Sequence, residues 1–178
     1  KKMKKTFNIP LSYEQNYFTN ECSDYDQIIL ALHGYQLNGE FMFKRLSRTL
    51  DLYRTLIISP NAPFLVPVKA DTGYIDGYSW YFFNSQKKSF YVNYEPAAQL
   101  MNELLNSINT QKKPVHIIGY SQGGYLSPRV AQLNAQVKKV YGIACIFRKE
   151  RFELKQDCEY IQIHGTKDTL VDYQEAKD

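Results

Sequence analysis

Hydrophobic residues follow two alternating patterns along this chain. Short, nearly continuous apolar runs are typical of strands that are buried on both faces of a sheet. The runs are Gln27–Leu32, Leu56–Ile58, Val115–Ile118, Val140–Ile146 and Tyr160–Ile163. Between them, apolar residues recur at helical spacing, marked by Met42, Leu46 and Leu50, by Ala97 through Ile108, and by Leu126, Val130 and Leu133. Buried strands that alternate with amphipathic helices predict an α/β fold, with a mostly parallel sheet and helices on both faces.

Three segments depart from this pattern. Thr6–Leu11 and Tyr13–Thr19 are expected to form two short strands, as a hairpin at one sheet edge. Residues 60–94 combine prolines, glycines and many aromatic residues with little periodicity, which predicts a long aromatic loop. Such a loop could line a pocket for an apolar group or cover the core. Pro128, inside the third helical pattern, removes a backbone donor, so a bend or an irregular turn is expected near Gly124.

Composition narrows the class of protein. The length of 178 residues, with 44% hydrophobic and 22% charged residues, is ordinary for one soluble globular domain. No apolar run is long enough to span a membrane. Four lysines among the first five residues account for the net charge of +4, so the body of the chain is neutral and nucleic acid is not an expected partner. Three widely spaced cysteines favour reduced thiols, no metal site and a cytoplasmic location.

The most informative motif is Gly119-Tyr120-Ser121-Gln122-Gly123, which joins a strand-like run to a helical pattern. A G-x-S-x-G sequence in this setting is the nucleophile elbow of an α/β-hydrolase. The sharp turn requires small neighbours and lifts the serine hydroxyl above the sheet. His33-Gly34 and Asp168 also follow predicted strand ends. Because ligands bind beyond the carboxyl ends of parallel strands, these residues and Ser121 should converge on one edge.

Four stretches together carry a resemblance to a known family. They are Leu32-His33-Gly34-Tyr35, the proline-rich Ser59–Pro63 with Pro67-Val68 and Trp80-Tyr81, the elbow Gly119–Gly124, and His164-Gly165-Thr166-Lys167-Asp168 with Val171. In order and spacing they resemble the phospholipase/carboxylesterase branch of the α/β-hydrolases, which includes the acyl-protein thioesterases. The resemblance covers nearly the whole chain and implies hydrolysis of esters or thioesters without a cofactor.

The resemblance also implies roles for individual residues. Ser121 would be the nucleophile, and Asp168 the acid that orients a catalytic histidine. The backbone N–H groups of Tyr35 and Gln122 would form the oxyanion hole. Tyr35 replaces the small apolar residue usual in the family, so its side chain is expected to reshape the pocket. Asp168 could instead be only the N-cap of a following helix.

Two further residues, Trp80 and Tyr81, are expected to contact the substrate. They belong to the aromatic stretch within residues 60–94. A small-molecule or lipid-like ester is the expected substrate, and the oligomeric state stays open.

The general base is the point where the sequence departs from the family. The fold orders its triad as serine, acid, histidine, yet no histidine follows Asp168. His33, His116 and His164 are expected to have supporting or packing roles. Three explanations stay open: a histidine in a C-terminal segment outside residues 1–178, a native pseudohydrolase, or one of these three acting as the base. We expect residues 1–178 to be a single α/β-hydrolase domain without its usual last strand and helix.

Several functions remain in competition at this point. The leading hypothesis is a serine esterase that acts on hydrophobic acyl esters through an acyl-enzyme on Ser121. A protein thioesterase would use the same residues. A catalytically inactive binding scaffold is the alternative from a different class, and a serine peptidase on the same fold is less favoured.

Overall fold

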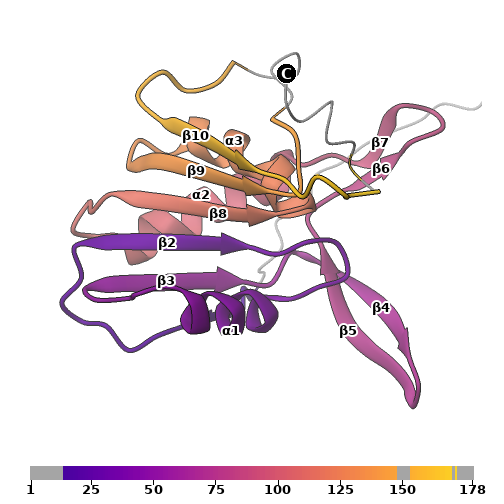
Figure 1. Ribbon diagram of the computed structural model, residues 1–178, viewed down its shortest axis with the longest axis horizontal. Helices are drawn as coiled ribbons and strands as arrows, with labels where there is room; N and C mark the ends of the chain where they lie inside the picture. Colours follow the sequence, from indigo (N-terminus) through magenta and orange to yellow (C-terminus); the bar gives the residue numbers. More distant parts are fainter. Residues whose placement is uncertain (1–13, 148–152, 170, 172–178) are drawn as a thin grey trace, which may run out of the picture.

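A six-stranded sheet forms the centre of the molecule (Figure 1). The computed structural model describes residues 14–147, 153–169 and 171. In spatial order the strands are β1 (Tyr17–Thr19), β3 (Thr55–Pro60), β2 (Gln27–Leu32), β8 (Val115–Tyr120), β9 (Val137–Ile143) and β10 (Glu159–Ile163). All neighbouring pairs are parallel except β1 with β3. The sequence predicted this mostly parallel sheet, and the structure confirms it.

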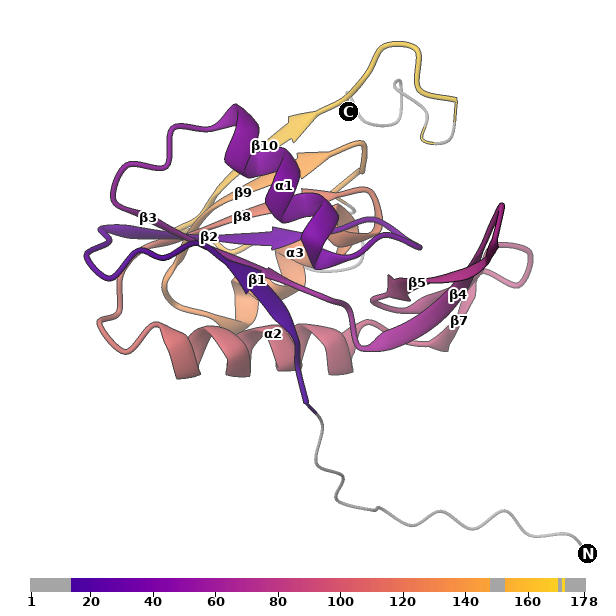
Figure 2. The same ribbon diagram turned by 90° about the horizontal axis from the view of Figure 1, so that it is seen from below.

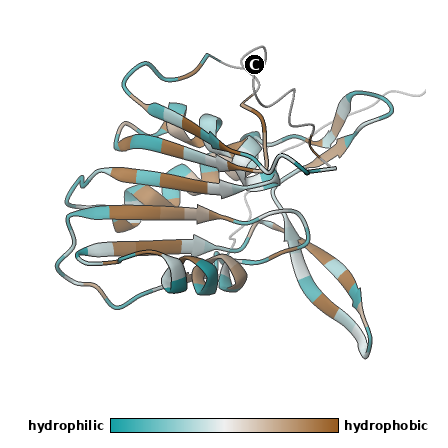
Figure 3. Cartoon of the chain, in the orientation of Figure 1, coloured by the Kyte–Doolittle hydropathy of each residue, from teal (hydrophilic) through white to brown (hydrophobic). Residues whose placement is uncertain are grey.

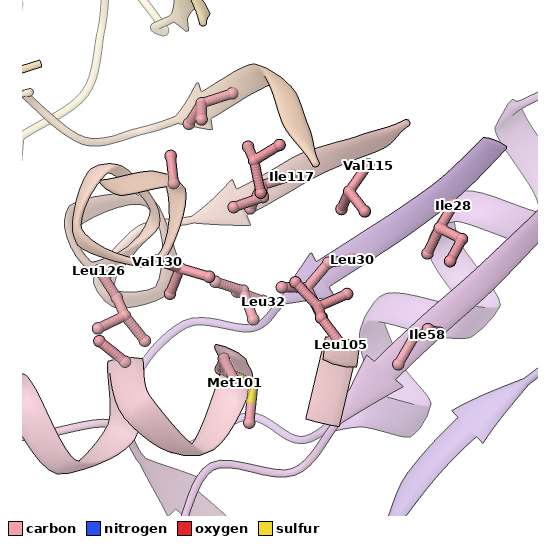
Figure 4. Packing of buried hydrophobic residues seen from close by; sticks show 14 of the residues in the cluster. Ile28, Leu30, Leu32, Ile58, Met101, Leu105, Val115, Ile117, Leu126 and Val130 are labelled. Carbon is pink, nitrogen blue, oxygen red and sulfur yellow. The ribbon is translucent and has the colours of Figure 1, made fainter. Parts of the chain in front are cut away.

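Helices cover both faces of the sheet (Figure 2). Helix α1 (Gly39–Thr49) packs Met42 and Leu46 on the face that carries Ile29 and Ala31. Helices α2 (Glu95–Ile108) and α3 (Gln122–Leu133) cover the other face. The residues that meet there are Ile28, Leu30, Leu32, Met101, Leu105, Leu126 and Val130 (Figure 4). Alternate residues of β2 thus enter two separate cores, which is why this strand is apolar after its first residue, Gln27 (Figure 3).

Strand register brings three loops to one edge of the sheet. Leu32 lies opposite Gly119, so His33 and Gly34 leave β2 at the level where Ser121 follows β8. Tyr120 lies opposite Ile143, which in turn lies opposite Ile163, the last residue of β10. The predicted convergence of the segments that follow these strands is therefore confirmed.

The segment at residues 60–94 is not the loop that its weak periodicity predicted. It forms two antiparallel hairpins that extend from the carboxyl edge of the sheet (Figure 1). The first consists of β4 (Phe64–Ala70) and β5 (Gly73–Ser79), and the second of β6 (Phe82–Asn84) and β7 (Ser89–Val92). Side chains of β4 alternate between half-buried and exposed, which suits a two-stranded ribbon. Pro67 is tolerated because β4 pairs with only one neighbour.

Several element boundaries also differ from the prediction. Strand β9 ends at Ile143, because Ala144 has a positive φ of 51° and Cys145 and Phe147 turn into the core. Residues 122–133 form one continuous α-helix that includes Pro128, so the irregular turn expected near Gly124 is not found. The predicted strand Thr6–Leu11 lies outside the described residues.

None of the helices in the described part of the chain is long and apolar enough to cross a membrane. All three cysteines are free thiols. Burial raises the pKa of Cys145, the most deeply buried of them, to about 12.

Candidate active site

Ser121 occupies the turn between β8 and α3 in a strained conformation. Its φ of 48° and ψ of −114° lie where residues with a side chain are rarely found. The N–H of Ser121 donates to the carbonyl of Ile143 on the neighbouring strand (2.8 Å), and the N–H of Tyr125 donates to the carbonyl of Ser121 (3.1 Å). The turn is therefore held from both sides, which keeps the serine at the carboxyl edge of the sheet.

The flanking glycines are required by close packing. A methyl group at Gly119 would lie 2.6 Å from the carbonyl oxygen of Gly123. A methyl group at Gly123 would lie 2.7 Å from the carbonyl oxygen of His33. Both distances are shorter than van der Waals contact, so larger residues would push α3 away from β2 and β8. This geometry gives the physical reason for the G-x-S-x-G pattern.

The strain at Ser121 leads to a stability prediction. We expect Ser121→Gly to be more stable than Ser121→Ala by about 1 kcal/mol, because only glycine accepts a positive φ without strain. The serine side chain makes no capping hydrogen bond to α3, so both variants lose the same hydroxyl without a lost cap. Thermal unfolding should show Ser121→Gly melting about 2–4 °C above Ser121→Ala. An equal or lower melting temperature for the glycine variant would show that the turn is not strained.

The loop that carries Tyr35 lies alongside the serine. A methyl group at Gly34 would lie 3.4 Å from Cβ of Ser121. This loop is tied to β5 by two hydrogen bonds, from the N–H of Gln36 to the carbonyl of Tyr78 (3.0 Å) and from the N–H of Tyr78 to the carbonyl of Leu37 (2.9 Å). The backbone at Tyr35 is thereby fixed beside the elbow.

Gln122 is the first residue of α3, where the helix itself supplies no acceptor for a backbone N–H. The first turn of α3 contains no acidic residue that could compete for this positive helix end. The arrangement suits an anion that forms next to Ser121.

The side chain of Gln122 has a role that the sequence reasoning missed. Its Oε1 accepts the N–H of Trp80 (2.9 Å), and its Nε2 donates to the carbonyl of Tyr81 (2.8 Å). The hydroxyl of Ser79 also contacts this amide. One side chain therefore fastens the aromatic segment to the elbow. A glutamine directly after the serine was the available signal, but its partners lie more than 40 positions away in the sequence.

His33 is fully buried beneath the loop and has both ring nitrogens engaged. The N–H of Ala62 donates to Nε2 (2.9 Å), so Nε2 is unprotonated and Nδ1–H donates to the carbonyl of Gly34 (2.7 Å). The indole N–H of Trp80 donates to the carbonyl of His33 (2.8 Å). Burial lowers the pKa of His33 to about 4. This neutral histidine joins the proline-rich segment to Trp80, in agreement with the supporting role expected for it.

The lowered pKa of His33 predicts a pH dependence of stability. Its ordinary value is 6.5, so the unfolded chain binds a proton that the folded chain rejects between pH 6.5 and about 4. The neutral His33 therefore contributes fully to the free energy of unfolding above pH 6.5. This contribution falls by about 3 kcal/mol as the pH drops to 4, because the unfolded chain gains a proton there and the folded chain does not. Chemical unfolding at several pH values gives the free energy of unfolding of the wild type and of His33→Gln. The difference between these two free energies should become smaller as the pH falls. A difference that is constant with pH would contradict this, and His116→Gln, at a less buried position, should show a smaller change.

Asp168 lies on the loop after β10 and contacts a histidine of the same loop. Its Oδ1 accepts the N–H of Val171 (3.1 Å), and its Oδ2 lies 3.4 Å from Nε2 of His164. That nitrogen is also 2.9 Å from the carbonyl of Val171. The bond to Val171 has the geometry of a cap, but the segment from 172 onward is outside the described residues. His164 therefore helps to hold Asp168 in place.

The remaining histidine, His116, lies near the opposite end of β8. Ser121 lies five positions further along the chain, which corresponds to about 16 Å of strand. Burial first, and then the charge of Lys139, lowers its pKa. Across the part of the chain that the structure describes, no three metal-ligating side chains gather into one group.

An aromatic cavity of about 370 Å³ lies next to the elbow. Its lining residues are Tyr35, Tyr81, Phe82, Phe83, Tyr91 and Gln122. The cavity thus borders Tyr35 and Gln122, the two residues expected to supply oxyanion donors. Both alternatives for the aromatic segment are found: its second hairpin lines this pocket, and Trp80 with its aromatic neighbours Tyr78 and Tyr81 packs into the core.

Trp80 is placed differently from the expectation. It is completely buried and packs against His33, with ring centres 4.9 Å apart and the ring planes tilted by 34°. The structure therefore corrects the expected substrate contact at Trp80: this side chain supports the loop from below, because its N–H and its ring are both used inside the core. Tyr81 does line the cavity.

Comparison with known proteins identifies the family. The model of the phospholipase/carboxylesterase family matches residues 18–178. The chain belongs to this family. Its members are hydrolases of the esterase and thioesterase type within the α/β-hydrolase superfamily, as the four motifs indicated.

Solved structures show the same fold at low sequence identity. Esterase PE8 superposes with a TM-score of 0.71 and 17% identity, covering 93% of this chain and 81% of that one. Acyl-protein thioesterase 2 from Zea mays gives 0.68 and 18%, covering 91% and 80%. YahD, determined with malic acid, gives 0.65 and 13%, covering 91% and 80%. No curated protein matches the sequence.

Proposed function

We propose that this member of the phospholipase/carboxylesterase family hydrolyses carboxylic esters or thioesters through an acyl-enzyme on Ser121. The observation that carries the proposal is the strained conformation of Ser121, with φ of 48° and ψ of −114°, at a turn between strand and helix. Such strain persists only where the surroundings impose it, and it is concentrated at functional sites. A role merely in turning the chain would favour glycine at this position.

The proposed reaction begins with attack of the Ser121 hydroxyl oxygen on the ester carbonyl. A base removes the hydroxyl proton, because serine is a weak nucleophile on its own. The tetrahedral intermediate then expels the alcohol or thiol, which takes that proton, and leaves an acyl group on Ser121. Water, activated by the same base, releases the acid and restores the serine.

Two backbone N–H groups would stabilise the negative oxygen of the intermediate. Tyr35 supplies one from a loop fixed to β5, and Gln122 supplies the other from the first turn of α3. Each such donor lowers the barrier by roughly 2.7–4 kcal/mol in enzymes of this kind. In the proposed mechanism Asp168 orients the imidazole that acts as the base.

The aromatic cavity predicts which acyl groups are accepted. The lining side chains in the described part of the chain carry no charge, and about 370 Å³ is at the small end of ligand pockets. We expect p-nitrophenyl butanoate and octanoate to be hydrolysed with a kcat/KM at least 10-fold above that of the negatively charged hemisuccinate ester, since a buried charge would lack a partner. A preference for the charged ester in this series would overturn the assignment of the cavity to the acyl group.

A binding scaffold without hydrolysis is the second candidate function. The observation in its favour is that His33 and His164 have hydrogen-bond partners other than Ser121. An ester that binds saturably but releases no p-nitrophenol, even as a single-turnover burst, would support this candidate. A burst equal to the enzyme concentration would support the acyl-enzyme.

A further inference from the structure

The cavity beside Ser121 is unusual in the chemistry of its walls. Among the residues that the structure describes, six line the cavity: five carry aromatic rings, and the sixth is Gln122. None of these six has an aliphatic or charged side chain. The amide of Gln122 is occupied by the backbone of Trp80 and Tyr81. A ligand in this cavity therefore meets mainly the faces and edges of rings.

A bulge lets the second hairpin supply rings from both of its strands. Phe82 pairs with Val92 and Phe83 with Phe90, so Tyr91 is an extra residue opposite this pair. An extra residue breaks the strict alternation of side chains and redirects its neighbours. As a result, Phe82, Phe83 and Tyr91 all reach the same cavity.

The inner rings are held by other rings before any ligand enters. The centre of Phe83 lies 5.0 Å from that of Phe90, and the centre of Tyr81 lies 5.7 Å from Phe90 at an angle of 77°. Phe82 contacts Phe64 at 5.8 Å. Because these rings are already held in place, the cavity is preformed, and the side chains lose little conformational entropy when a ligand binds.

The outer rings are open to solvent. Tyr35 is 47% exposed and Tyr91 is 71% exposed, although both carry large apolar surfaces. A ligand that covers them removes this surface from water, which favours binding. Phe83 is also 37% exposed, so the cavity offers a ligand both this ring, held by Phe90, and the two more exposed tyrosines.

We propose that this cavity selects esters that carry a planar aromatic group over esters that carry a saturated group of the same size. The inference rests on the proposed function, in which Ser121 attacks the ester beside the cavity. Aromatic rings prefer edge-to-face or offset contacts with one another beyond simple area burial. The volume of about 370 Å³ suits one ring on a short linker rather than a long lipid chain.

The test compares two esters that differ only in the saturation of one ring. Binding of ethyl 3-phenylpropanoate and ethyl 3-cyclohexylpropanoate to the Ser121→Ala protein is measured by ligand-observed NMR. The cyclohexyl ester is the more hydrophobic, so a cavity that recognises only apolar area binds it at least as well. We expect the phenyl ester to bind more tightly by about 2- to 10-fold. A second pair, 2-phenylethyl acetate and 2-cyclohexylethyl acetate, carries the ring on the alcohol. Comparing the two pairs shows whether the cavity recognises a ring on the acyl or on the alcohol part of the ester.

Variants connect the preference to the rings themselves. Tyr91→Leu and Phe83→Leu should bring the phenyl-to-cyclohexyl affinity ratio close to one, and the exposed Tyr91 makes the first variant safe for folding. Tyr53→Leu changes a tyrosine outside the cavity that is 80% exposed, and it should leave the ratio unchanged.

A cyclohexyl preference in both pairs, no binding of any of these esters at millimolar concentration, or a ratio unaffected by both ring variants would overturn the proposal. Because binding is measured in Ser121→Ala, absence of hydrolysis in the wild type would count only against the proposed function.

Discussion

Replacing Ser121 with alanine is expected to abolish both acylation and hydrolysis. The oxygen of Ser121 is the proposed attacking atom, and removing the nucleophile of a serine hydrolase reduces kcat by about 10⁴- to 10⁶-fold. The measurement is incubation with a fluorophosphonate probe over several hours, followed by mass spectrometry of the intact protein and of its peptides. The wild type should gain one probe, located on Ser121, and Ser121→Ala should gain none.

A matched control separates this effect from a change in structure. Ser107 is an exposed serine on α2, where its hydroxyl donates only to a carbonyl of its own helix, so Ser107→Ala should be labelled like the wild type. Melting temperatures of the three proteins establish that each is folded. Labelling that persists in Ser121→Ala, or that maps to another serine, would remove Ser121 from the mechanism.

The second large effect concerns the base. The 178 residues by themselves are expected to hydrolyse p-nitrophenyl butanoate at least about 10⁴-fold more slowly than an enzyme with a complete triad. The reason is the placement of the three histidines. Both nitrogens of His33 are bound, His116 is near the far end of β8, and His164 is directed at Val171 and Asp168. Initial rates measured over a range of substrate concentrations give the kcat that is compared.

Imidazole added to the solution tests this explanation directly. A small neutral base can take the proton of Ser121 where no side chain does so, and turnover by the wild type should rise with imidazole concentration. Ser121→Ala should show only the rate of imidazole in buffer. Turnover near 10 s⁻¹ without imidazole, a typical value for enzymes, would contradict the expectation. Alanine variants of His33, His116 and His164 would then identify the residue that acts as the base.

Local sequence was sufficient to predict the framework of the site. The apolar runs at Gln27–Leu32 and Val115–Ile118 predicted two central strands, because a strand buried on both faces is apolar at nearly all of its positions. The glycines around Ser121 predicted the strained turn, because only small residues allow α3 to approach β2 and β8 so closely. Order along the chain then predicted that the segments after parallel strands meet at one edge.

Local sequence was insufficient for the two hairpins and for the end of β9. The strands within residues 64–79 pair with each other through backbone hydrogen bonds. Such pairing places few demands on side chains when one face of the hairpin is exposed, so the sequence shows no clear pattern. The apolar run after β9 continues to Phe147, but a positive φ at Ala144 turns it out of the sheet and into the core. Hydrophobicity shows that such residues are buried and does not distinguish a strand from a packed loop.

The sequence by itself determined the family, the elbow at Ser121 and the α/β framework, because each depends on neighbouring residues or on a repeating pattern. Only the tertiary structure decided how the site is supported. The hydrogen bonds from Ala62 to His33 and from Trp80 to Gln122 join positions 29 and 42 residues apart. The aromatic cavity also combines three separate segments with a bulge in one hairpin. Contacts of this kind depend on how the elements pack together, and no local pattern of residues records that.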